Sequence, residues 1–148
     1  MPRMPACILC LAVVLAFSAC TGNSFHSSVP TVPVYMDINI LTEDPHFVTS
    51  NTGAYKEYTQ KRYETDFIGY RGLLVYVGMD ARYHAFDLAC PHCLNRVGMQ
   101  DMMYAVCPSC GEQYEMTYGY ATPARGISRE ALRRYSTSFD GTILRIRN

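Results

Sequence analysis

The sequence predicts an all-β fold, an antiparallel sandwich or barrel with a small metal-binding tip. Apolar residues alternate with polar ones from Val34 onward, as they do in a half-buried strand. Turn residues separate many further short runs rich in β-branched and aromatic side chains, which is typical of barrels and sandwiches. Two C-x-x-C motifs lie in the second half of the chain. The 148 residues suffice for one domain, which we place at 33–148, with the tip at about 88–116.

The first expected strand begins at Val34. Met36, Ile38 and Ile40 would share its buried face, and the polar residues between them would face solvent. A hairpin is expected farther along, because a turn rich in Gly and Asp separates two runs of strand-forming residues. The two strands of this hairpin are expected at 73–77 and 83–88. The remaining expected elements are short strands at Val106, 114–117 and 142–146, and a helical turn at 128–134.

The amino-terminal residues 1–19 resemble a signal peptide, with Arg3 before an apolar run at 6–17. This run is too short to span a bilayer, and two small residues follow it before Cys20. We interpret Cys20 as the lipidated first residue of the mature protein and 20–32 as its tether. The membrane is then a partner, and the protein is exported and anchored on the periplasmic side or the cell surface. The alternative is an ordinary cleaved signal peptide with a coincidental cysteine.

Charge argues against a nucleic-acid partner, because Lys plus Arg and Asp plus Glu both number 13 and the net charge is zero. The last quarter of the chain nevertheless concentrates arginines. We interpret these arginines as a solvated face, with a docking face for an acidic partner or for membrane phosphates as the alternative.

The two C-x-x-C motifs at 90–93 and 107–110 both read C-P-x-C. A tight turn of this kind places two thiolates on one side, and two such knuckles form a tetrahedral sulfur site suited to zinc or to a single iron. Disulfides or a redox dithiol are the alternatives in an exported protein. The expected metal ligands are Cys90, Cys93, Cys107 and Cys110.

The region 72–147 resembles a Rieske domain. Residues 88–92 are similar to the first ligand loop of that family, C-x-H, and residues 106–111 are similar to its second loop, C-P-x-H-G. Tyr114 stands at the aromatic position after the second loop, and 140–146 matches the closing strand. The resemblance implies an antiparallel β fold with a rubredoxin-like or zinc-ribbon-like tip.

The resemblance also implies a ligand set for a [2Fe–2S] cluster. Cys90 and Cys107 would bind one iron, and His92 and Cys110 would bind the other. This sequence departs from the family because Cys110 stands where the family has its second histidine, and Cys93 is an added thiol. These departures move the site toward four thiolates on one metal.

Three further residues bear on the choice between the two ligand sets. Leu94 replaces a glycine of the family after the first loop, and Glu112 replaces a serine after the second. We interpret His92 as a knuckle residue that points outward or supports a sulfur, with a role as cluster ligand as the alternative. A carboxylate at Glu112 near the site would disfavour reduction.

Three functions follow as expectations. The first is a non-enzymatic Rieske-like lipoprotein in which one zinc or iron on four cysteines mainly holds the tip together. The alternative is an electron-transfer protein with a [2Fe–2S] cluster, and the second alternative is a metal-free binding module that kept the fold. If the protein is redox-active, we expect an electron carrier rather than an oxygenase, because the chain has no room for a second, mononuclear-iron domain. No redox partner can be named from the sequence.

Overall fold

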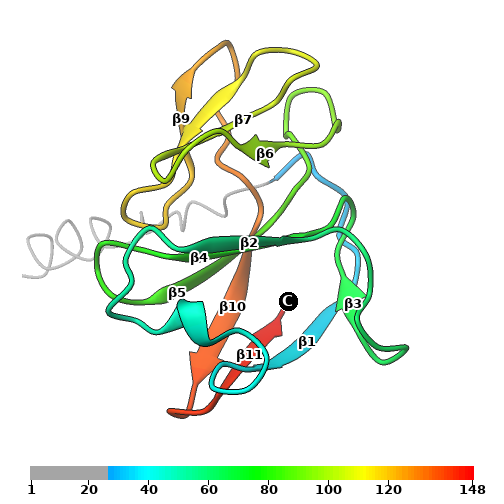
Figure 1. Ribbon diagram of the computed structural model, residues 1–148. Coiled ribbons are helices and arrows are strands. Elements are labelled where there is room, and N and C mark those ends of the chain that lie inside the picture. Colours follow the sequence, from blue (N-terminus) through cyan, green and yellow to red (C-terminus); the bar gives the residue numbers. More distant parts are fainter. Residues whose placement is uncertain (1–26) are drawn as a thin grey trace, which may run out of the picture.

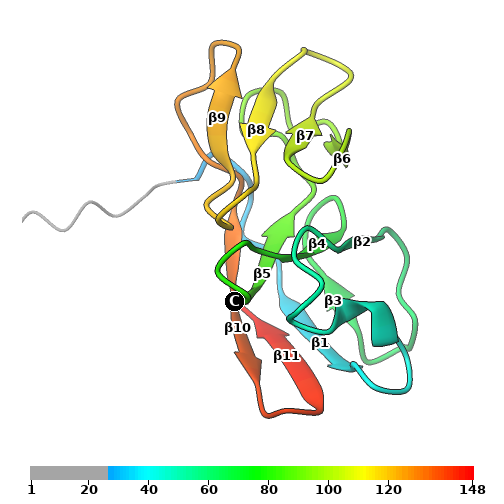
Figure 2. The same cartoon turned by 60° about the vertical axis from the view of Figure 1, so that its left-hand side comes forward.

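The computed structural model describes residues 27–148, and these form two antiparallel sheets (Figure 1). The larger sheet curls into a near-closed barrel, and the smaller one lies at one end of it as a tip (Figure 2). The expectation of an all-β fold is therefore confirmed. In spatial order the larger sheet contains β2 (Tyr55–Tyr58), β4 (Leu73–Val77), β5 (Tyr83–Asp87), β10 (Arg134–Phe139), β11 (Ile143–Arg147), β1 (Val34–Asn39) and β3 (Phe67–Ile68). The smaller contains β6 (Gly98–Met99), β7 (Tyr104–Val106), β8 (Gln113–Glu115) and β9 (Thr122–Arg125).

Strand β1 forms where the sequence alternates with a period of two. Val34, Met36 and Ile38 are buried, and the residues between them are exposed or half-buried. β1 pairs antiparallel with β11 on one side and with β3 on the other, so the first strand is joined to the last. The inward face of β1 thereby becomes one wall of the barrel core.

The β4–β5 hairpin is buried on both faces, because it is the wall between two hydrophobic cores. Leu73, Val75 and Val77 point into the barrel core. Leu74 and Tyr76 point into a second core, which lies under the small sheet. The alternation of side chains along one strand thus supplies both cores, and it fixes the tip to the barrel.

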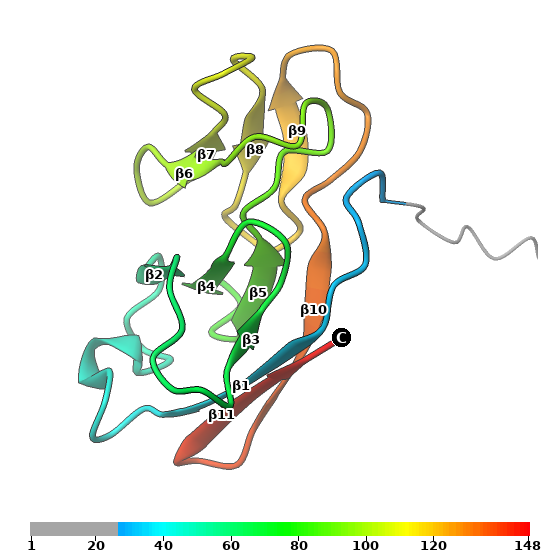
Figure 3. The ribbon, with the colours of Figure 1, turned by 90° about the vertical axis from the view of Figure 1, so that its right-hand side faces the viewer.

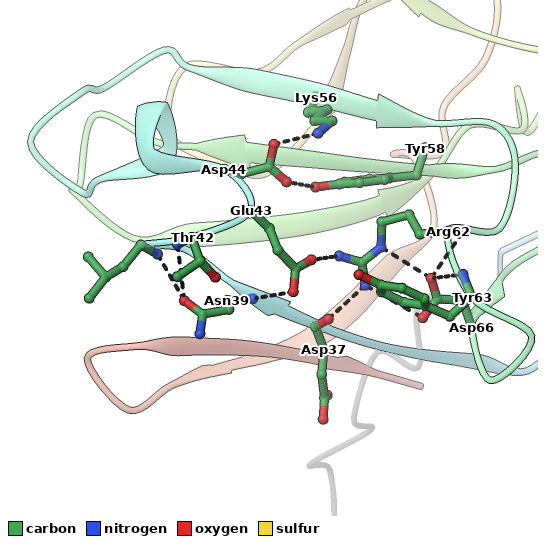
Figure 4. Close-up of polar contacts among 11 residues, drawn as sticks. Asp37, Asn39, Thr42, Glu43, Asp44, Lys56, Tyr58, Arg62, Tyr63 and Asp66 are labelled. Atoms are coloured by element: carbon green, nitrogen blue, oxygen red, sulfur yellow. Dashed lines mark hydrogen bonds and ion pairs between the residues drawn. The ribbon is translucent and has the colours of Figure 1, made fainter.

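The loop 59–66 joins the two edge strands, β2 and β3, and Arg62 of this loop holds it to β1 and to the turn that follows β1 (Figure 4). Arg62 is the centre of this network, because its guanidinium contacts the carboxylates of Glu43 and Asp66 and donates to the carbonyl oxygen of Asp37 at 2.6 Å. Beside it the buried carboxylate of Asp44 accepts from the Tyr58 hydroxyl at 2.7 Å and pairs with Lys56 (Figure 4).

The helical turn expected at 128–134 is wrong. Residues 126–133 are an irregular segment, and Arg134 begins β10, where it pairs with Phe86 of β5. The reason is tertiary, because the buried carboxylate of Glu112 accepts the backbone N–H groups of Ile127 and Ser128. The one helical element among the described residues is a short 3-10 turn, η2 (Pro45–Phe47).

The segment 27–33, just before β1, lies against the domain (Figure 3). Val29 is buried, its carbonyl oxygen accepts from Arg133 at 2.8 Å, and Ser28 donates to the carboxylate of Glu130. The predicted signal peptide and Cys20 lie outside the described residues. Within 27–148, none of the helical structure has the length and apolar character that crossing a bilayer requires.

Candidate metal centre

The four cysteines of the two C-P-x-C motifs come together in the tip. Each motif forms the same turn, in which the residue after the second cysteine donates its N–H to the carbonyl oxygen of the first, from Leu94 to Cys90 and from Gly111 to Cys107, at 2.8 Å in both cases. Leu94 and Gly111 both have positive φ, 58° and 78°. The second sulfur of each knuckle accepts an N–H from two residues farther on, Asn95 or Glu112.

The four sulfurs form a compact group, since all of them lie within 4.8 Å of one another. The Sγ–Sγ distances are 3.4 Å for Cys93–Cys110, 3.5 Å for Cys93–Cys107 and 3.7 Å for Cys90–Cys110. A tetrahedron of sulfurs around zinc at about 2.3 Å has edges of about 3.8 Å. All four cysteines are free thiols, and these separations are far longer than a disulfide bond of about 2.0 Å. The donor set therefore fits a single tetrahedral metal ion.

Burial differs systematically across the group. The first cysteine of each knuckle, Cys90 and Cys107, is buried in the second hydrophobic core. Cys93 is half-buried and Cys110 is exposed. A metal on these four sulfurs would have one edge in the core and one edge at the surface.

The thiols influence one another's ionisation. Burial opposes the ionisation of Cys93, but hydrogen bonds from Asn95 and from the neighbouring thiols outweigh it and lower the pKa of Cys93 to about 7. Burial raises the pKa of Cys107. Burial, together with the contacts with the other sulfurs, also raises the pKa of Cys110. Cys93 is thus the easier thiol to ionise, and Cys107 and Cys110 give up their protons when a cation binds.

A chain of polar contacts supports the buried side of the group. The Tyr114 hydroxyl lies 3.3 Å from Cys90 Sγ, and Tyr114 is fully buried. Burial and then the contact with Cys90 raise the pKa of Tyr114, so its hydroxyl stays protonated and can donate to the sulfur. Ser128 also contacts this hydroxyl, and the carboxylate of Glu112 holds the backbone N–H of Ser128. Glu112 is therefore engaged with the loop at 126–128, and its carboxylate makes no hydrogen bond to the sulfurs among the described residues.

The first knuckle is positioned by a second buried carboxylate, that of Asp87 at the end of β5. Its Oδ1 accepts from the backbone N–H of Ala89 at 2.8 Å and of Arg71 at 3.1 Å. Its Oδ2 accepts from the N–H of Tyr70 at 2.6 Å and from the Tyr135 hydroxyl at 2.7 Å. Asp87 thereby ties the loop before β4, the start of the knuckle and β10 to one point.

His92 does not join the sulfur group. Its side chain is exposed, and it is not among the ligand atoms that lie close together. The structure brings together the set of four cysteines, and His92 is not part of this group.

Sequence reasoning missed two of the supporting residues, Asn95 and Asp87. Asn95 Nδ2 lies 3.6 Å from Cys93 Sγ. Asp87 is fully buried in the structure. Its signal in the sequence is a charged residue within a run of strand-forming residues, because such a side chain is rarely buried without partners.

Comparison with known proteins gives a distant likeness to a solved structure. No protein-family model matches the chain, and no curated protein matches it. A chain of a solved structure described as "Complex of reduced oxygenase and oxidized ferredoxin in carbazole 1,9a-dioxygenase" matches with a TM-score of 0.47 and 14% identity, over 76% of this chain and 93% of that chain. A likeness at this level carries no conclusion about function.

Proposed function

We propose that the four cysteines hold one metal ion, zinc or iron, whose main role is to stabilise the tip of an exported lipoprotein with a Rieske-like domain. The observation that carries this proposal is the spacing of the sulfurs, all within 4.8 Å of one another. A two-iron cluster binds one pair of ligands at each end and separates the pairs by its own length. The compact group therefore favours one ion over a [2Fe–2S] cluster.

A structural role is supported by the packing around the group. Cys90 and Cys107 are part of the core beneath the small sheet, and strands β6 and β8 are only two or three residues long. Such short strands bury little apolar surface, and small domains often need a metal to hold them. Structural thiolate sites bind zinc with free energies of about 10 kcal/mol or more, which is available to folding.

Elemental analysis of protein purified without oxygen, with acid-labile sulfide measured on the same sample, tests the proposal. We expect one zinc or one iron per chain and no sulfide. Two irons with two sulfides would mean a cluster, and a metal-free protein would leave only a binding module.

Electron transfer is a second candidate, and the exposure of Cys110 favours it. A single iron here would have its Cys93–Cys110 edge close to solvent, where an electron could leave or arrive. An iron-loaded protein would be red and would bleach reversibly with a reductant, whereas a zinc protein is colourless. Zinc in protein taken from its native host would exclude this candidate.

The lipid anchor is also a proposal, supported by the apolar run and the two small residues before Cys20. Mass spectrometry of the membrane-bound protein should find an amino-terminal peptide that begins at Cys20 and carries acyl chains. A mature terminus elsewhere, or an unmodified Cys20, would contradict it.

A further inference from the structure

We propose that a hollow beside the segment 27–33, which we name the amino-terminal arm, binds the phosphate headgroups of an anionic membrane. This inference rests on the proposed lipid anchor for its geometry, and it adds a second contact between protein and membrane. The hollow has a volume of about 600 Å³. We name it the arginine hollow, and the lining residues that matter here are Ser27, Tyr120, Arg129, Arg133 and Arg134.

Charge is the first argument. Three arginines line the arginine hollow against one acid, Glu130, although the whole chain has no net charge. Glu130 is engaged with the arm through the hydroxyl and backbone N–H of Ser28. Within residues 27–148 Arg129 forms no salt bridge. The hollow is therefore a local excess of positive charge on a neutral protein.

The donors of the arginine hollow are incompletely used, which is the second argument. Arg133 donates through Nη2 to the carbonyl oxygen of Val29, but its buried Nε has no hydrogen-bond partner among the described residues. Arg134 contacts His84 Nδ1 at 3.0 Å through Nη2. Phosphate oxygens are acceptors that match a guanidinium well, and the exposed side chains of Arg129 and Arg134 are the ones that a headgroup can reach.

Position is the third argument. Ser27 lines the arginine hollow, and Cys20 is only seven residues before it (27 − 20 = 7). A fully extended chain covers at most about 3.5 Å per residue, so the hollow is held within about 25 Å of a lipid on Cys20. Figure 3 shows the arm running beside the segment that leads into β10. A lipid on Cys20 would therefore keep this face within reach of the membrane surface.

An exposed tyrosine of the arginine hollow suits a lipid surface. Tyr120 lines the hollow and is 64% exposed. Tyrosines and arginines are favoured at the headgroup level of membranes, and basic residues near an anionic surface each contribute about 1 kcal/mol.

A membrane is favoured over an acidic protein because the tether provides the second contact. Tethering also gives the arginine hollow a high local concentration of headgroups, which adds to the affinity that the hollow has without the lipid.

The test uses the mature, metal-loaded chain from residue 20 with Cys20→Ala, so that no lipid is attached. It is sedimented with vesicles of phosphatidylcholine, with or without phosphatidylglycerol. We expect binding to the anionic vesicles only. Arg129→Gln should weaken this binding about fivefold, and Arg129→Gln with Arg134→Gln about 25-fold.

Arg145→Gln is the matched control, since it also removes one exposed positive charge but lies on β11, where Arg145 pairs with Asp140. It should bind as the parent protein does. Equal loss in Arg129→Gln and Arg145→Gln would overturn the site, because it would indicate net charge alone. Failure to bind anionic vesicles would overturn it as well, and retention on immobilised polyglutamate would then assign the face to an acidic protein. An unmodified Cys20 in the mass spectrum would instead overturn the anchor, whatever the vesicles show.

Discussion

At the scale of single residues, the two knuckles differ where their geometry is most demanding. Both place the residue after the second cysteine in the left-handed region, which glycine adopts freely at Gly111 and which costs Leu94 about 1 kcal/mol. Leu94 also accepts a hydrogen bond from Arg71 through its carbonyl oxygen. A non-glycine residue keeps this conformation only where its surroundings determine it. Here those surroundings are the hydrogen bonds of Leu94 to the carbonyl oxygen of Cys90 and from Arg71, so the first knuckle depends on its neighbours more than the second does.

Cys93→Ser and His92→Ala separate the two ligand sets. If one ion sits on four thiolates, Cys93→Ser should lose most of the metal, because a hard oxygen replaces a soft thiolate. His92→Ala should keep its metal, because the His92 side chain is exposed and outside the sulfur group. Metal content and the visible spectrum of both variants measure this. Full metal in Cys93→Ser combined with loss in His92→Ala would contradict the four-cysteine site.

Metal affinity should rise steeply with pH. Cys107 and Cys110 have pKa values above the ordinary thiol value, so both are protonated at neutral pH and at least two protons leave when a metal binds. Two released protons correspond to a change of about 100-fold in affinity per pH unit. The raised pKa values favour the metal-free protein as pH falls, so affinity is lost toward acid. Competition with a chelator between about pH 6 and about pH 7 tests this. A change below tenfold would show that the thiols ionise without the metal.

At the scale of elements, two buried carboxylates decide how irregular segments lie beside regular ones. Asp87 ends β5 and organises the start of the first knuckle, and Glu112 precedes β8 and organises the segment before β10. The second half of the chain is thus arranged by side-chain acceptors as much as by strand pairing. These acceptors compete with local helix formation, since they use the N–H groups that a helix would use.

Asp87→Asn should lower the free energy of unfolding by about 3 kcal/mol. The amide replaces one acceptor oxygen with a donor, and that donor faces groups that are themselves donors. Tyr135→Phe is the matched control, because it removes only one of the four hydrogen bonds to Asp87 and should cost about 1 kcal/mol. Denaturant unfolding of metal-loaded protein measures both. Equal stabilities of Asp87→Asn and the parent would show that the carboxylate does not organise this loop.

The regular parts could be predicted from the sequence, and the irregular ones could not. Period two at Met36 and Ile38 reflects one buried face, and the C-P-x-C spacing reflects a turn that is complete within a few residues. Both signals are local. By contrast, segment 126–133 follows the carboxylate of Glu112, a contact between residues far apart in sequence. The sulfurs could be grouped from spacing, but Tyr114 was placed against Cys90 only by the fold.

At the scale of the whole molecule, the two cores share one wall and differ in what completes them. The barrel core is closed by β1 and β11, whereas the core beneath the small sheet includes Cys90 and Cys107. A metal on these cysteines would belong to only one of the two cores. The two ends of the molecule should therefore respond differently when it is removed.

Chelation should unfold the tip and leave the barrel folded. Backbone amides of Val97 and Ala105 in the tip should lose protection from hydrogen exchange, while those of Ile38 and Leu144 in the barrel should keep most of theirs. The expected loss in the tip is several kcal/mol, in line with structural thiolate sites. Re-addition of zinc is the control. Unchanged protection throughout would contradict a structural metal, and uniform loss would show that both cores depend on it.

The pairing of the first strand with the last has a consequence for the order in which the chain assembles. Tyr35 pairs with Arg147, so the barrel closes only when almost the whole chain is present, and the entropy of that long loop makes the step slow. The four cysteines lie within residues 90–110, and their contacts are local by comparison. A chain that ends before β11 should therefore already bind its metal. The metal-bound tip would then be the nucleus on which β1 and β11 later pair.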